Sequence, residues 1–87
     1  MKILITGGSG FIGSALIRYF LQKFSNYKIL NIDKLTYASN DSLNQFNNNK
    51  NYEHKEIDIV DSHSLNRIFM DFAPNFVMHL AAESHVD

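Results

Sequence analysis

The chain has 87 residues, a formal net charge of −1, 45% hydrophobic and 20% charged residues, and no cysteine. This length allows one small domain, and the composition is typical of a soluble globular protein. The lack of a basic cluster argues against nucleic acid and anionic membranes as partners, and the lack of cysteine excludes disulfides and zinc ribbons. The N-terminal apolar run is too short for a signal peptide or a membrane span, so we expect a cytoplasmic protein.

Residues 1–13, MKILITGGSGFIG, combine an apolar run, a glycine-rich turn and the start of a helical pattern. The run predicts a strand at positions two to six, buried on both faces of a parallel sheet. Gly7, Gly10 and Gly13 fit G-x-x-G-x-x-G, and with Gly8 in place of Gly7 the spacing fits G-x-G-x-x-G. Glycines permit the turn, let backbone amides approach a pyrophosphate, and let the helix lie close to the strand. This context predicts a phosphate-binding loop.

Helical periodicity predicts a first helix over residues 10–24. Phe11, Ala15 and Tyr19 recur at every fourth position there. With Ile12, Leu16 and Phe20 alongside, they indicate one broad apolar face that belongs to the core. Asn26 is a candidate for the left-handed residue that commonly follows a helix.

A second helix is predicted between residues 61 and 73. Asp61 or Ser62 can cap its first turn, and an apolar stripe with the spacing i, i+3, i+4, i+7 begins at Leu65. We expect Pro74 to end this helix, because a proline disfavours the helical conformation of the residue before it.

Three further strands are predicted at residues 28–32, 52–57 and 76–80. The first of them stops at Asp33, 20 residues after Gly13. An acidic residue at this distance binds the hydroxyls of the adenosine ribose, and it would repel a 2′-phosphate, which favours NAD over NADP. The alternative is an acidic residue that merely ends a strand.

The order of these elements predicts a β-α-β-α-β-α-β arrangement, in which the Asn-rich, poorly periodic residues 36–51 form the middle crossover. Right-handed crossovers give a parallel, doubly wound α/β sheet of the Rossmann type with strand order 3-2-1-4. The order reverses between strands one and four, which brings the glycine loop and residues 81–84 to one crevice, the predicted cofactor site. His79, in the fourth strand, is interpreted as a core or interface histidine.

Three segments resemble the N-terminal part of the extended short-chain dehydrogenase/reductase family: TGGSGFIGSALIR at 6–18, NIDKLTYASN at 31–40 and VMHLAAESHVD at 77–87. Within that family they are most similar to nucleotide-sugar 4,6-dehydratases. The resemblance implies NAD as the cofactor, dTDP-glucose or a related sugar nucleotide as the substrate, and a homodimer for the intact enzyme. It further implies oxidation at C4 of the glucosyl group, loss of water across C5 and C6, and return of the hydride to C6.

The resemblance also implies roles for individual residues. The glycine loop would hold the pyrophosphate, the ends of the second and third strands would hold the adenosine, and the segment after the fourth strand would line the nicotinamide. The implied cofactor-binding residues are Gly7, Gly10, Phe11, Ile12, Gly13, Asp33, Lys34, Leu35, Thr36, Asp58, Ile59, Leu80, Ala81, Ala82, Glu83 and Ser84. The implied substrate-binding residues are Ser84 and His85.

The sequence predicts no catalytic residue and no metal ligand within the chain. The Tyr-x-x-x-Lys pair of the family is matched formally by Tyr19 and Lys23, but these positions belong to the first helix, remote from the nicotinamide. We therefore expect residues 1–87 to be the N-terminal part of an NAD-binding domain, with the substrate domain and the catalytic residues beyond Asp87. The alternatives are a sugar-nucleotide 4-epimerase or decarboxylase of the same family and a non-catalytic nucleotide-binding protein.

The fourth strand is apolar and would form an uncovered edge of the sheet, a feature that promotes association between chains. A chain of this size also buries a small share of its surface. We expect the 87-residue chain to be marginally stable or to self-associate.

Overall fold

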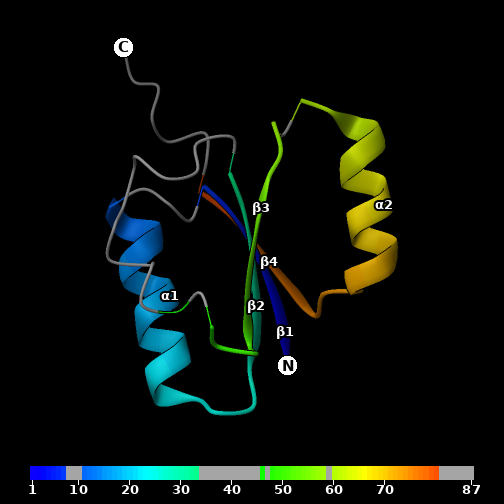
Figure 1. Ribbon diagram of the computed structural model, residues 1–87. Helices are drawn as coiled ribbons and strands as arrows, with labels where there is room; N and C mark the ends of the chain where they lie inside the picture. The colour runs from blue at the N-terminus through cyan, green and yellow to red at the C-terminus, as the bar shows by residue number, and fades with distance from the viewer. Residues whose placement is uncertain (8–10, 34–45, 47, 59, 81–87) are drawn as a thin grey trace.

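The computed structural model describes the chain apart from residues 8–10, 34–45, 47, 59 and 81–87. Its elements are β1 (Lys2–Thr6), α1 (Phe11–Lys23), β2 (Lys28–Asp33), β3 (Tyr52–Glu56), α2 (Ser62–Phe72) and β4 (Phe76–His79). The four strands form one parallel sheet in the order β3-β2-β1-β4, with α1 on one face and α2 on the other (Figure 1). The predicted fold class and strand order are confirmed. Most of the middle crossover lies outside the described residues.

β1 lies between β2 and β4 and is buried on both faces. Ile5 packs with Ile17 of α1 on one side of the sheet, and Leu4 packs with Ile68 of α2 on the other. Both strand residues are fully buried. The continuous apolar run is therefore explained by a strand that has a helix on each side.

α1 packs on the sheet through a stripe that coincides only in part with the predicted apolar face, since Phe20 of that face packs against the core. Tyr19 of the predicted stripe is 52% exposed, whereas Gly13, Ser14 and Ile17 are buried. Leu21, one turn after Ile17, extends this contact with the core. The prediction missed the stripe because two of its members are small and not hydrophobic, and small residues allow a helix to approach a sheet closely.

α2 begins and ends with local hydrogen bonds. Asp61 is its N-cap: one carboxylate oxygen accepts from the Ser64 backbone N–H (3.2 Å) and the other from the Ser64 hydroxyl (2.9 Å). At the other end Ala73 is left-handed, with φ 51°, and its N–H donates to the Phe69 carbonyl. This confirms that the helix stops before Pro74. The prediction for Asn26 is wrong, because Ala73 is the single non-glycine residue of positive φ in the described part of the chain.

The central strand β2 carries a buried polar residue on the face of the sheet that α1 covers. Asn31 is fully buried and its Nδ2 donates to the hydroxyl of Tyr52 on β3, over 3.1 Å. Burial raises the pKa of the Tyr52 hydroxyl; the hydrogen bond from Asn31 opposes this, and the negative charge of Asp33 adds to it. A buried amide of this kind requires a polar partner, so the pair fixes the position of β3 against β2.

We expect Tyr52→Phe to lower the free energy of unfolding by about 1 kcal/mol at neutral pH, because the buried Asn31 amide loses an acceptor. Because folding raises the pKa of Tyr52, its contribution to the free energy of unfolding is fully present below the ordinary pKa of a phenol. This contribution is lost as the pH rises through the raised pKa. Urea unfolding of both proteins at neutral and alkaline pH measures this. A difference that does not shrink at alkaline pH would contradict it.

β4 leaves apolar side chains on the surface of the described part of the chain. Phe76 is 57% exposed and Val77 is 48% exposed, and β1 is the one described strand that pairs with β4. A flat apolar edge of this kind pairs readily with another strand.

We expect the 87-residue chain to self-associate and Val77→Lys to shift it towards monomer, because a charge on the edge opposes pairing with a second chain. Sedimentation velocity over a range of concentrations measures the distribution. Val60→Lys is the matched control, since Val60 is 81% exposed and lies outside the sheet. An equal effect of both variants would show that net charge, not the β4 edge, controls association.

Candidate functional site

The carboxyl ends of the strands are joined by backbone hydrogen bonds at one edge of the sheet. Gly7 N–H donates to the Ile32 carbonyl of β2 (2.9 Å), and Leu80 N–H donates to the Thr6 carbonyl of β1 (2.8 Å). The chain therefore leaves β1 and β4 from fixed positions, on the two sides of the point where the strand order reverses. In open α/β sheets this point is where ligands bind.

Gly7 and Gly13 show why glycine is needed in the segment after β1. Gly7 has φ 79°, a conformation that disfavours residues with a Cβ. Gly13 is buried in the first turn of α1, where a Cβ would displace the helix from the sheet. The amides of that turn have no partners within the helix and, with the turn at Gly7, form the kind of place where phosphate oxygens are bound.

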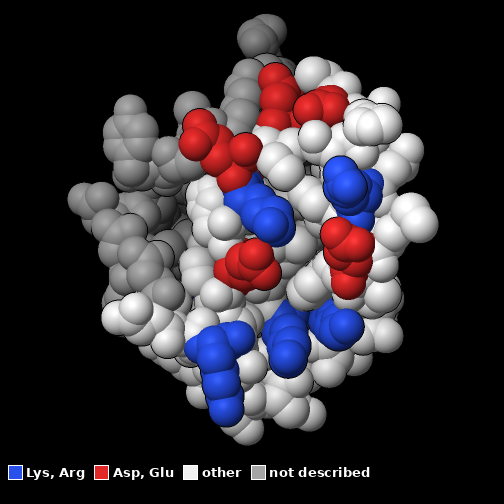
Figure 2. All heavy atoms as spheres, turned by 45° about the vertical axis from the view of Figure 1, so that its right-hand side comes forward, with Lys and Arg blue, Asp and Glu red and all other residues white. Residues whose placement is uncertain are grey.

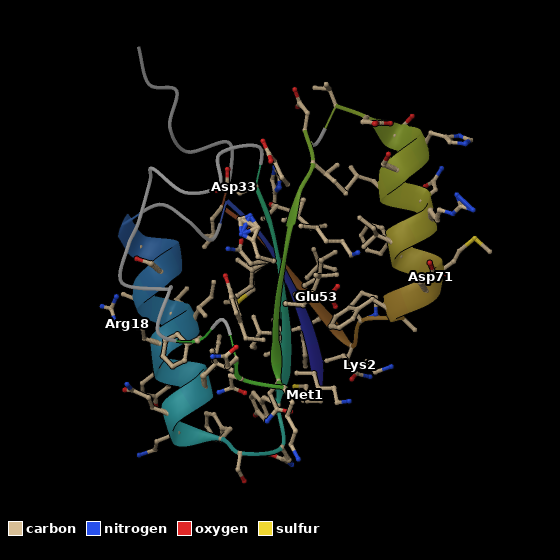
Figure 3. The ribbon with its side chains drawn as sticks, in the orientation of Figure 1. Met1, Lys2, Arg18, Asp33, Glu53 and Asp71 are labelled. Carbon is tan, nitrogen blue, oxygen red and sulfur yellow. The ribbon has the colours of Figure 1, made fainter. Side chains whose placement is uncertain are left out.

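Asp33 ends β2, next to the exit of β1. Its carbonyl accepts from the Ile57 N–H at the end of β3 (3.2 Å), which holds the two strand ends together. Figure 3 places Asp33 at the end of the sheet opposite Met1 and Lys2, and its side chain is half-buried. A carboxylate at this edge can accept hydrogen bonds from the two hydroxyls of a ribose.

Asp58 follows β3 and forms a turn before α2. Its Oδ1 accepts from the Val60 N–H (3.1 Å), and its carbonyl accepts from the Asp61 N–H (2.9 Å). Asp58 is exposed. It lies beyond the strand that neighbours β2, so the two predicted acidic residues come from adjacent strand ends.

The structure places six of the predicted cofactor residues at or near this edge: Gly7, Ile12, Gly13, Asp33, Asp58 and Leu80. Phe11 begins α1, but its side chain is outside the description. Outside the described residues lie Gly10, Lys34, Leu35, Thr36, Ile59, Ala81, Ala82, Glu83, Ser84 and His85. Lys23 ends α1, so the formal Tyr-x-x-x-Lys match lies towards the far end of that helix from the glycine turn.

The sequence interpretation missed a side-chain contact at the same edge. Thr6 and His79 form a hydrogen bond between Oγ1 and Nδ1 at 2.6 Å. His79 is exposed, so the core interpretation of this residue is wrong, and the interface interpretation stays a prediction. Two polar residues that end neighbouring strands were the available signal, but their pairing requires the register of β1 and β4.

A concavity of the described surface lies away from this edge, between β3 and α2. It is a groove of about 410 Å³ whose charged lining residues are Glu53, Lys55, Arg67 and Asp71. Figure 2 shows acidic and basic side chains interspersed on this face, and Lys55 is paired with Glu53 at 3.4 Å. Mixed charges beside an edge strand are a common guard against pairing with other chains. Protection of the β3 edge therefore explains the charged groove, and the carboxyl ends of the strands remain the candidate ligand-binding site.

A parallel sheet with reversed strand order, a left-handed glycine after β1 and a carboxylate at the end of β2 together define a Rossmann-type α/β fold. The chain belongs to the family described as GDP-mannose 4,6 dehydratase, whose family model matches residues 4–87. Among the described elements, none of the helices is long and apolar enough to cross a membrane.

Curated relatives of known name are similar over the whole chain. The dTDP-glucose 4,6-dehydratase of Haemophilus influenzae is 54% identical over 100% of this chain and 26% of its own length. That of Escherichia coli is 50% identical over 100% of this chain and 24% of its own length. The chain thus spans about a quarter of the length of these relatives.

Solved structures show the same arrangement. dTDP-glucose 4,6-dehydratase from Bacillus anthracis in complex with NAD aligns with a TM-score of 0.88 at 36% identity, over 97% of this chain and 27% of that chain. The enzyme WbmG of Bordetella bronchiseptica in complex with NAD aligns with a TM-score of 0.81 at 32% identity, over 100% of this chain and 26% of that chain. UDP-glucose 4-epimerase from Thermotoga maritima aligns with a TM-score of 0.76 at 34% identity, over 97% of this chain and 25% of that chain.

We expect Asp61→Ala to lower the thermal midpoint of unfolding at neutral pH, because the first turn of α2 loses its cap beside Asp58. Hydrogen bonds from the Ser64 N–H and hydroxyl lower the pKa of Asp61. The contribution of Asp61 to stability is therefore fully present above the ordinary pKa of a carboxyl group. It is lost as the pH falls through the lowered pKa of Asp61. Thermal scans at neutral and acidic pH test this, with Asp71→Ala as a control for the loss of a surface carboxylate. A difference from wild type that persists in strong acid would contradict it.

Proposed function

We propose that this chain binds NAD across the carboxyl ends of β2, β1 and β4. The observation that carries the proposal is the position of Asp33 at the end of β2, directly beside the left-handed turn at Gly7. A ribose-binding carboxylate and a phosphate-binding turn on adjacent strand ends match the two polar parts of an adenosine diphosphate. The NAD complexes of similar structures support this assignment.

The chemistry of the described residues fits the cofactor. The first turn of α1, including Ile12 and Gly13, would hold the pyrophosphate through backbone amides. The turn at Gly7, whose own N–H is bonded to Ile32, would let the phosphates approach the backbone because glycine has no Cβ. Asp33 would accept from the ribose hydroxyls, and Asp58 would lie beside the adenine. Bound NAD supplies a hydride acceptor; this part of the chain supplies its binding and orientation.

We further propose that a longer protein carrying this segment converts dTDP-glucose to dTDP-4-keto-6-deoxyglucose with loss of water. Relatives at 54% and 50% identity that bear the name dTDP-glucose 4,6-dehydratase support this. Among the solved structures, the dehydratase has a TM-score of 0.88 and the UDP-glucose 4-epimerase one of 0.76. The acid and base groups of the reaction would lie beyond Asp87, and the segments after the strands would form one wall of the sugar pocket. We propose a cytoplasmic homodimer without nucleic acid or membrane partners.

We expect Asp33→Asn to weaken NAD binding about tenfold or more, because hydrogen bonds to a charged carboxylate are stronger than those to an amide. NADP binding should improve relative to NAD, since the repulsion of the 2′-phosphate is removed. Isothermal titration with both dinucleotides measures the two affinities.

Asp71→Asn is the matched control, because it removes the same charge from an exposed position on α2, away from the strand ends (Figure 3). It should leave both affinities unchanged. An unaltered NAD to NADP ratio in Asp33→Asn would show that Asp33 does not bind the ribose.

A further inference from the structure

β1 and β4 are joined at their carboxyl ends by a side-chain hydrogen bond between two residues to which the proposed NAD site assigns no contact. Thr6 and His79 are directly opposite each other in the parallel register, and Oγ1 and Nδ1 are 2.6 Å apart. Thr6 is 6% exposed, so its hydroxyl is removed from bulk water and depends on a partner within the protein. The backbone bond from Leu80 N–H to the Thr6 carbonyl lies beside it.

This bond lies at the base of both segments that leave the sheet at the site. Gly7 follows Thr6, and Leu80 follows His79. Gly7 is already held to β2 by its bond to the Ile32 carbonyl. β4 has four residues and pairs among the described strands with β1 alone, so its end has few other restraints.

The strand order indicates for which half of a dinucleotide binding would depend on the Thr6–His79 bond. With the adenosine ribose at the end of β2 and the pyrophosphate at the end of β1, the remaining half must extend over the next strand in the sheet. That strand is β4, where Leu80 leaves the sheet. This step rests on the NAD site proposed above.

We infer that His79 is a positioning residue for the nicotinamide half of bound NAD. Its hydrogen bond with Thr6 holds the end of β4, and with it Leu80, at a fixed distance from the glycine turn. His79 does not contact the dinucleotide in this account; it acts through the strand end that does. The adenosine half, held by Asp33 and the glycine turn, is independent of it.

The test compares the binding of NAD with that of ADP, which contains the adenosine half alone. The variants are made in the full-length protein that carries these residues. Thr6→Val and His79→Leu each remove one partner of the Thr6–His79 hydrogen bond. Each should weaken NAD about threefold to tenfold, the range of a neutral hydrogen bond, and the double variant should weaken it no further. ADP affinity should stay at the wild-type value.

Conservative variants separate positioning from folding. Thr6→Ser keeps the hydroxyl, and His79→Asn places an amide near the position of Nδ1, so both should retain most of the NAD affinity. His63→Leu is the matched control, since it removes an exposed imidazole from α2 and should change neither ligand.

Each outcome decides between the two proposals. A wild-type protein that binds neither ligand overturns the proposed function and the inference with it. A wild-type protein that binds both, with variants that bind NAD equally well, overturns the role of His79 alone. A parallel loss of NAD and ADP affinity in the variants shows a general structural effect and also overturns it.

Discussion

The burial of β1 between two strands and two helices is the constraint on which the rest of the structure depends. A strand in this position must be apolar on both faces, as Leu4 and Ile5 are, and it must end where the core ends. Its neighbours β2 and β4 run parallel to it, so all their carboxyl ends meet at one edge. The turn at Gly7 is therefore placed between two other strand ends by the packing of the sheet.

Under the proposed function, packing and ligand binding at this edge would depend on the same local structure. Gly13 and Ser14 are buried because α1 lies close against the sheet, and that closeness directs the first turn of the helix towards the exit of β1. A larger residue at either position would displace the helix and the amides of its first turn together. Because the proposed binding surface is largely backbone, its chemistry would depend on the accuracy of packing, to which the Thr6–His79 hydrogen bond would contribute.

The sequence predicted the elements well where strong local signals exist. The apolar runs, the glycine turn and Pro74 set strand and helix ends to within about one residue of the observed ones, and the crossover rule gave the strand order. Contacts that depend on register could not be predicted. The Asn31–Tyr52 bond and the packing stripe of α1 at Ile17 arise only once the strands and helices are assembled, since one-dimensional periodicity does not report small or polar residues in a core.

Mapping of bound NAD onto the backbone of this chain tests the central claim most directly. In ¹⁵N–¹H spectra, added NAD should shift the amides of Gly7, Gly13, Asp33 and Leu80, which meet at the carboxyl ends of the strands. Amides that line the groove between β3 and α2, such as Arg67, should stay unchanged. Saturable shifts confined to the strand ends would agree with the account. Shifts centred on the groove, or none at all with the protein folded, would contradict it.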